Sequence, residues 1–136
     1  MVSCRRAVSS CYYALFHCLA RECADLLIGG AGSHRSEEAW RQMYRSLEHN
    51  HTKEKCINNN MIKKFPRGIE DFANTFVTMQ HKRHTADYDP FETFTKSSVE
   101  SDIVLVEEAI KKFKGEPVSD RRAFCAYVIL KRHTWN

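Results

Sequence analysis

Charged side chains end the apolar stripe of one predicted helix, which extends from Pro66 to about Asp87. The apolar face of this helix contains Ile69, Phe72, Ala73 and Phe76, and Gln80 falls within the same face. At about 100° per residue, Arg83 and Asp87 fall on the same face. Unpaired buried charge is costly, so both residues need a physical reason to be there. Two interpretations follow: an ion pair that fixes packing, or a cleft in which Arg83 faces a phosphate or a partner.

The residues around Arg83 suit the cleavage of a phosphodiester without a metal ion. Such a reaction needs a group that titrates near neutral pH, usually histidine, and a cation for the phosphate. His84 and Tyr88 lie close to Arg83 in the sequence, and Arg6 and His17 would face it across a cleft. The candidate catalytic residues are therefore Arg83, His84 and Tyr88. The same set also occurs as the ordinary polar end of a helical bundle.

Histidine spacing gives weaker support for a metal site. His81, His84 and Asp87 follow one another at steps of three, and helical residues at this spacing can share a metal ion. However, His81 lies about 120° from the apolar face. The histidines before Cys56 stand in a polar segment, where such spacings are common by chance. We predict neither a metal ion nor a cofactor.

The first helix is predicted to extend from Ser3 to Leu27, where a glycine-rich segment ends it. Its apolar arc is very wide, which indicates burial on more than one side, in a bundle, a dimer or both. The remaining narrow stripe is polar and consists of Arg6, Ser10, Tyr13 and His17. This stripe is either a partly exposed edge or the wall of a cleft that also contains Arg83 and Asp87.

Three further helices are predicted at 36–47, 95–113 and from 119 or 120 to about 132. Ser36 would cap the first of them, and Ser97 or Ser98 the second. The polar segment 49–60 is predicted to be a loop with at most one helical turn. Phe91 and Phe94 would plug the end of the bundle. No segment alternates with period two, so the chain is predicted to be an all-α, up-and-down bundle of four or five helices.

Composition indicates one globular domain over residues 1–136. The net charge of +4 is compatible with an anionic partner but is too small to indicate one. The longest uncharged run, 7–20, has 14 residues, fewer than the roughly 18 that a membrane span needs. Arg5-Arg6 precedes no cleavage site, so we expect a cytoplasmic protein. None of the six cysteines forms a Cys-x-x-Cys pair, and we predict buried, reduced thiols, with zinc ligation the weaker alternative.

Two motifs together resemble those of the HEPN-domain superfamily. Residues 6–17, RAVSSCYYALFH, are similar to the R-A-x-S-x-x-Y-Y-A-x-F-H opening of such domains. Residues 83–90, RHTADYDP, are similar to the R-x-x-A-D-Y-D segment of one branch. The resemblance covers roughly Cys4 to Phe113. The family usually has a further helix ahead of the first motif, whereas five residues precede Arg6, so a shortened chain or a dimer partner would explain the wide apolar arc.

The resemblance implies a helical bundle, often a homodimer, whose two motif helices face a shared groove. Arg6, Ser10, Tyr13, His17 and Asp87 would then be binding residues. Many members are metal-independent RNases with Arg followed after four to six residues by His, and others bind nucleotides or act as non-catalytic partners. Here Tyr88, Asp89 and Pro90 occupy those positions.

We therefore expect an RNA- or nucleotide-binding protein with a degenerate RNase motif, as part of a toxin–antitoxin or defence system. A nucleotidyltransferase or an antitoxin would be its partner. The alternatives are an active metal-independent endoribonuclease and a bundle that only binds other proteins.

Overall fold

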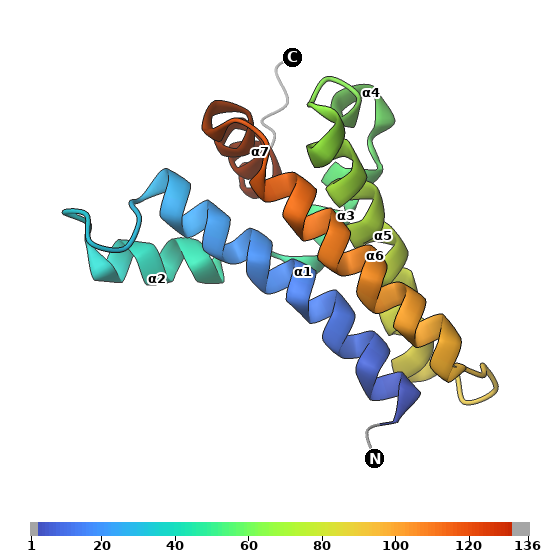
Figure 1. Cartoon of the computed structure of the whole chain (residues 1–136). Helices are drawn as coiled ribbons and strands as arrows, with labels where there is room; N and C mark the ends of the chain where they lie inside the picture. The colour runs from blue at the N-terminus through green and yellow to red at the C-terminus, as the bar shows by residue number, and fades with distance from the viewer. Residues whose placement is uncertain (1–2, 132–136) are drawn as a thin grey trace.

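The computed structural model describes residues 3–131, which form seven helices and no strand (Figure 1). The helices are α1 (Cys4–Leu27), α2 (Glu37–Arg45), α3 (His49–Ile57), α4 (Asn59–Ile62), α5 (Arg67–Tyr88), α6 (Lys96–Lys114) and α7 (Val118–Ile129). The all-α prediction is confirmed for these residues, but the number of helices exceeds the predicted four or five. Among the described residues, no helix combines the length and hydropathy that a membrane span requires.

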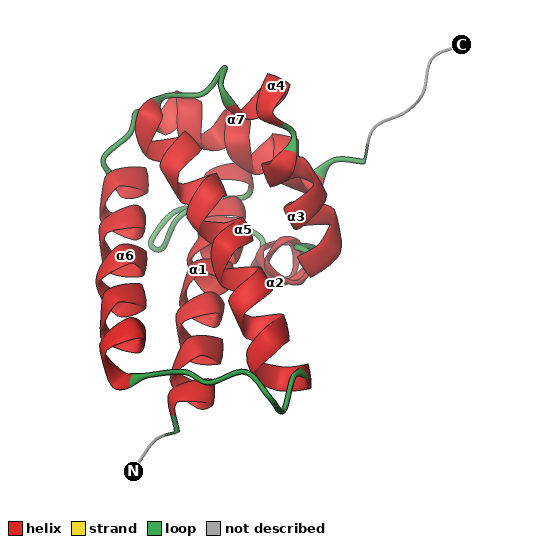
Figure 2. Ribbon diagram, turned by 90° about the vertical axis from the view of Figure 1, so that its right-hand side faces the viewer, coloured by secondary structure: helices red, strands yellow, loops and turns green. Residues whose placement is uncertain are grey.

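The three long helices α1, α5 and α6 form the body of the bundle. Figures 1 and 2 show α5 running opposite to α1 and α6, and each of the three contacts the other two. Fully buried side chains of their common core include Tyr12, Leu15, Ile69, Phe72, Phe76 and Phe113. Burying each of these large side chains stabilises the fold by roughly 1.5–3 kcal/mol. The predicted apolar face of α5 is confirmed, since all five of its residues are buried.

Helix α1 is covered on several sides by the chain itself, because it contacts α2, α5, α6 and α7. Its buried residues are Val8, Cys11, Tyr12, Leu15, Leu19, Ala20, Cys23 and Ala24. The wide apolar arc therefore reflects a central position within this chain. A further helix or a dimer partner is not needed to explain it.

The segment predicted as a loop after residue 48 is largely helical, so that prediction was wrong. Thr52 and Cys56, four residues apart on α3, turn inward and are fully buried. Helix α3 contacts α5 and α7, and Asn58 then caps α4 by accepting a hydrogen bond from the N–H of Met61. The segment is polar overall, and packing of its two small inward residues stabilises a helix that local propensity does not predict.

Serine and threonine side chains begin three of the helices. Ser3 caps α1 and Ser36 caps α2, each by accepting a hydrogen bond from a first-turn N–H. Helix α6 is capped by Thr95, whose hydroxyl accepts from the N–H of Ser98 in a reciprocal capping box. The predicted cap at Ser97 or Ser98 was therefore placed too late, because Ser98 is the partner of the cap.

The last helix begins at Val118, directly after Pro117, rather than after a cap at Ser119 or Asp120. Proline already has the backbone φ of a helix and lacks an N–H, so it suits a helix start. Helix α7 ends at Ile129. The predicted end near Arg132 lies outside the described residues.

The connection between α5 and α6 buries only one of its two phenylalanines. Phe94 packs against the core, and the guanidinium carbon of Arg5 lies 5.4 Å from its ring centroid. Phe91 is 90% exposed. Its N–H donates to the side chain of Asp89 at 2.9 Å in a tight turn. The prediction that both rings plug the bundle end was wrong for Phe91.

All six cysteines are free thiols, and four of them are buried. Burial raises the pKa of Cys56 to about 12 and that of Cys18 to about 11. A thiol reacts as its thiolate, so these two are held in their unreactive form.

Candidate functional site

Arg83 and Asp87 form the ion pair that their spacing on α5 predicts. Arg83 Nη1 lies 3.4 Å from Asp87 Oδ2 and also 3.4 Å from the hydroxyl oxygen of Tyr13 on α1. Asp87 accepts a second hydrogen bond, of 3.0 Å, from the hydroxyl of Ser9 on α1. Both contacts of Nη1 are long and therefore weak. They orient the guanidinium and leave it capacity to bind an anion.

Two tyrosine rings hold the guanidinium of Arg83 between α1 and α5. Its central carbon lies 5.1 Å from the ring centroid of Tyr12 and 5.7 Å from that of Tyr13. Cation–π contacts in this range contribute roughly 0.5–2 kcal/mol each. The side chain is 18% exposed, and its Nε is buried without a hydrogen-bond partner in the described part of the chain. Stacking, more than hydrogen bonding, therefore positions this charge.

A cavity of about 390 Å³ opens beside Arg83, between α3 and α5. It is lined by Asn50, Lys53, Gln80, His81, Arg83 and His84. The lysine and the arginine are cationic at neutral pH, the two histidines become so on protonation, and none of the lining residues is a carboxylate. Asp87 offsets part of the arginine's charge from outside the lining. The cavity still presents a surplus of positive charge and hydrogen-bond donors, which suits an anion.

Gln80 is the only buried residue among those that line this cavity, with 6% of its surface exposed. Its amide nitrogen donates to the backbone carbonyl of His49 at 3.3 Å. Its Oε1 has no hydrogen-bond partner among the described residues. A buried acceptor without a donor costs roughly 1–3 kcal/mol. This oxygen is closed to solvent, so a ligand in the cavity does not reach it in this structure.

His49 lies near Arg83 but does not line the cavity. Its Nδ1 is 2.5 Å from the hydroxyl of Tyr12, and its ring stacks on Phe16 with centroids 4.0 Å apart. Burial, the charge of Arg83 and the nearby His17 together lower the pKa of His49. Burial raises the pKa of Tyr12, against the opposing charge of Arg83. Both groups are thus held neutral at pH 7, and a neutral His49 adds no repulsion to Arg83.

His17 joins an aromatic line that attaches α2 to α1. Its Nδ1 lies 2.8 Å from the hydroxyl of Tyr44, and its ring stacks on both Tyr44 and Tyr13 with centroids 6.1 and 6.0 Å apart. Trp40 continues the line, 5.4 Å from Tyr44. The predicted polar stripe therefore divides: Tyr13 contacts Arg83, whereas His17 faces α2.

The contacts predicted for Arg6 and Ser10 are made by the residues just before them. Arg5 Nη1 donates to carbonyl oxygens at the end of α5, at 2.8 Å for that of Ala86. The hydroxyl of Ser9 donates a hydrogen bond to the carboxylate of Asp87 on α5. Arg6 and Ser10 are exposed, and within residues 3–131 neither side chain bonds to α5. A shift of one residue rotates a helical side chain by about 100°, so the register of α1 decides which residues meet α5.

The other two predicted catalytic residues occupy different surroundings. His84 lines the cavity beside Arg83. Tyr88 is 70% exposed and lies outside the cavity lining, although its ring centroid is 4.8 Å from that of His84. The structure thus brings Arg83 and His84 together and leaves Tyr88 in solvent.

In the part of the chain that the structure describes, no three His, Cys, Asp or Glu side chains are placed to hold one metal ion. The spacing of His81, His84 and Asp87 does not produce such a group. The two histidines line the cavity, whereas Asp87 turns toward Ser9 and Arg83.

Asn50 and Lys53 are site residues that the sequence did not identify. Both belong to α3, and they were missed because this segment was predicted to be a loop. A signal existed in the spacing, since Thr52 and Cys56 are four apart, while Asn50 and Lys53 are three apart on another face. Neither inward residue is strongly apolar, which makes the pattern weak.

A comparison with protein-family models, with curated proteins and with solved structures finds no match in any of the three.

Proposed function

We propose that this chain is a HEPN-like RNA- or nucleotide-binding protein that holds a phosphate group in the cavity between α3 and α5. The observation that carries the proposal is the composition of the lining around Arg83: two fixed cations, two histidines, two amides and no carboxylate. The pair of HEPN-like motifs supports it independently, because the second motif supplies Arg83 itself.

Arg83 is suited to be the principal phosphate ligand. Its guanidinium is held by the rings of Tyr12 and Tyr13, so it loses little freedom when it binds. Its planar set of donors matches two phosphate oxygens at once. Lys53, on the facing helix, would add a second charge.

Gln80 shapes the wall of the cavity and does not offer a free acceptor to a ligand. Its Oε1 is buried and has no hydrogen-bond partner within the described residues. The donors available to a phosphate in this cavity are therefore those of Arg83, Lys53 and Asn50.

Binding without cleavage is the function proposed for this site. The positions at which the RNase motif has a histidine hold Tyr88, Asp89 and Pro90, and Tyr88 is largely in solvent. By the same resemblance, we propose that the chain acts in a toxin–antitoxin or defence system, with a nucleotidyltransferase or antitoxin partner and as a homodimer.

Metal-independent RNA cleavage is a second candidate because His81 and His84 line the same cavity as Arg83. One imidazole would take the proton of the 2′-hydroxyl as its oxygen bonds to phosphorus. A protonated imidazole would give its proton to the leaving 5′-oxygen as the P–O5′ bond breaks, while Arg83 stabilises the phosphorane charge.

The test compares wild type with Arg83→Ala and Arg67→Ala in fluorescence-anisotropy titrations of a labelled single-stranded RNA and of ATP. Arg67 is a matched control because it lies on the same helix and its side chain is 88% exposed. We expect Arg83→Ala to weaken binding at least tenfold and to reduce its salt dependence, and Arg67→Ala to change it less than twofold. Equal affinities for the three proteins would overturn the proposal.

Incubation of the same RNA in EDTA separates the two candidate functions. We expect intact RNA with every variant. If the wild type cleaved the RNA and both Arg83→Ala and His84→Ala did not, the proposal of an RNase would replace that of a binding protein.

A further inference from the structure

Helix α7 is apolar on more sides than the core can cover. Residues 123–130, AFCAYVIL, are eight consecutive apolar residues, which point in all directions on a helix. Phe124, Cys125 and Val128 face the core and are buried. The opposite side carries Ala123, Ala126 and Tyr127. Leu130, directly after the helix, is 63% exposed.

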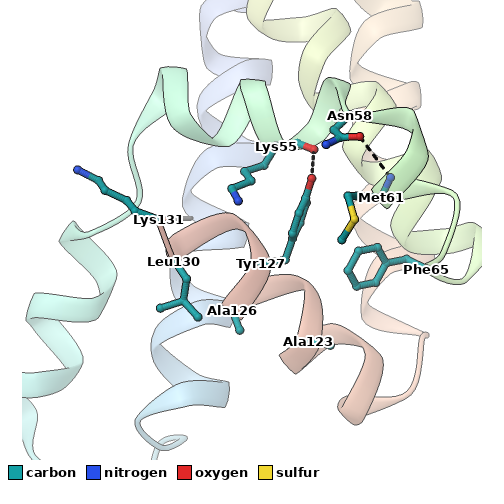
Figure 3. Close-up of a pocket in the computed structure, with 9 residues that line it drawn as sticks. All are labelled: Lys55, Asn58, Met61, Phe65, Ala123, Ala126, Tyr127, Leu130 and Lys131. Carbon is teal, nitrogen blue, oxygen red and sulfur yellow. Dashed lines mark hydrogen bonds between the residues drawn. The ribbon is translucent and has the colours of Figure 1, made fainter. Parts of the chain in front are cut away.

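This second side of α7 forms one wall of a pocket of about 660 Å³, with α3 and α4 on the other side (Figure 3). Its lining consists of Lys55, Asn58, Met61, Phe65, Ala123, Ala126, Tyr127, Leu130 and Lys131. Ala123 and Ala126 are small, and opposite them stand Met61 and Phe65, so the hollow arises where short side chains face long ones. The volume falls within the range of roughly 300–1,000 Å³ typical of small-molecule sites.

Lys55 places one positive charge in this apolar hollow. Its Nζ lies 4.8 Å from the ring centroid of Tyr127 and forms no ion pair among residues 3–131. The hydroxyl of Tyr127 donates to the backbone carbonyl of Lys55 at 2.7 Å, which fixes the ring beneath the ammonium group. Figure 3 shows the Lys55 side chain directed toward the middle of the pocket. The charge is therefore placed for a ligand and not for a protein carboxylate.

The other polar lining residues are also donors. Asn58 uses its Oδ1 to accept from the N–H of Met61, so its amide N–H groups are the part left for a ligand. Lys131 stands at the rim, points away from the pocket centre and lies 3.9 Å from Glu48. With an ammonium group and no acidic residue in the lining, the pocket favours a ligand whose polar end is an anion.

We propose that this pocket binds a medium-chain alkyl carboxylate. The carboxylate would meet the ammonium of Lys55 and the amide of Asn58. The alkyl chain of the ligand would lie along Ala126, Leu130 and Met61. This site shares no residue with the cavity around Arg83, so the proposal holds or fails independently of the proposed function.

The first test titrates octanoate, octan-1-ol and octylammonium into the full chain and follows the methionine methyl groups by ¹H–¹³C NMR. Met61 lines the pocket, whereas Met43 lies on α2 and Met79 in the core. We expect octanoate to shift Met61 selectively and to bind at least tenfold more tightly than octylammonium. Equal affinities for the three probes, or no shift of Met61, would overturn the proposal. A Met61 shift that depends on protein concentration alone would assign the surface to a second copy of this chain instead.

The second test uses charge reversal with a matched control. Lys55→Glu should weaken octanoate binding at least tenfold and strengthen that of octylammonium. Lys111→Glu makes the same change of net charge at an exposed position of α6 and should leave both unchanged. Ala123→Phe, at an exposed position, should fill the hollow and abolish octanoate binding while the thermal midpoint is kept. Octanoate binding that survives Lys55→Glu would contradict the site.

Discussion

Two hollows lie on either side of α3, and their linings differ in kind. The cavity toward α5 is lined by cationic and amide side chains, whereas the pocket toward α7 is lined mainly by apolar ones. Lys53 belongs to the first and Lys55 to the second. Residues two positions apart on a helix are separated by about 200°, so Lys53 and Lys55 of one short helix point to opposite sides. The difference shows that α3 supplies one lysine to each hollow, and that the facing helix sets the polarity around that lysine.

The facing helices differ because their sequences do. Helix α5 carries the polar run His81–His84 in its C-terminal third, where its apolar stripe stops. Helix α7 instead presents residues of its apolar run 123–130 to the pocket. Ring packing stabilises the apolar side, with Tyr127 5.8 Å from Phe65, whereas hydrogen bonds and stacking orient the polar side.

The largest effect should come from breaking α3 itself. Glu54 is exposed in the middle of this helix, so Glu54→Pro changes the backbone with little loss of side-chain contact. We expect it to cost about 3 kcal/mol and to weaken the binding of both RNA and octanoate. Urea denaturation and the two titrations measure this, with Glu54→Ala as the control. Retention of both affinities would show that α3 is not their common support.

Charge reversals should separate the two hollows. Lys53→Glu should weaken RNA binding about tenfold, or about 1.4 kcal/mol, and leave octanoate binding within twofold. Lys55→Glu should do the reverse. Anisotropy and NMR titrations on the same two variants provide the comparison, and each variant is the other's control. If either substitution weakened the binding of RNA and of octanoate equally, the two hollows would not be separate sites.

Thr52 offers a way to strengthen the shared helix. Its hydroxyl is buried and has no hydrogen-bond partner among the described residues. Thr52→Val keeps the shape and removes the unsatisfied hydroxyl, so it should stabilise the protein by about 1 kcal/mol in urea denaturation. Thr78→Val, at an exposed position of α5, is the control and should have little effect. A destabilised Thr52→Val variant would indicate that the hydroxyl makes a bond that stabilises the fold.

The smallest effect should be the pH dependence on the polar side. The pKa of His49 is lowered from 6.5 in the folded protein by burial, by Arg83 and by His17. The unfolded chain therefore binds more protons below about pH 6.5, so the contribution of His49 to stability is complete above that pH and is lost as the pH falls through the lowered pKa. We expect the urea midpoint to fall from pH 7.5 to 5.

Replacing the imidazole isolates this contribution. His49→Gln should flatten the fall of the urea midpoint, whereas His34→Gln, at an exposed loop position, should not. An unchanged slope in His49→Gln would show that other groups cause the pH dependence.

Periodicity predicted those features of the site that lie on one helix. The buried face of α5 and the Arg83–Asp87 ion pair both follow from spacings of three and four residues. Periodicity failed for α3, whose inward residues Thr52 and Cys56 are too small and too weakly apolar to indicate a helix. It also could not predict that Ser9, and not Ser10, reaches α5, because that depends on how α1 is rotated in the bundle.

The sequence by itself determined the helical class, most of the long helices and the ion pair on α5, since these depend on interactions between residues close together in the chain. Only the tertiary structure decided that α3 is a helix, that Lys53 stands across from Arg83 and that Lys55 faces α7. The physical reason is that helix register and helix packing are set by many distant contacts at once, and no local pattern contains their sum.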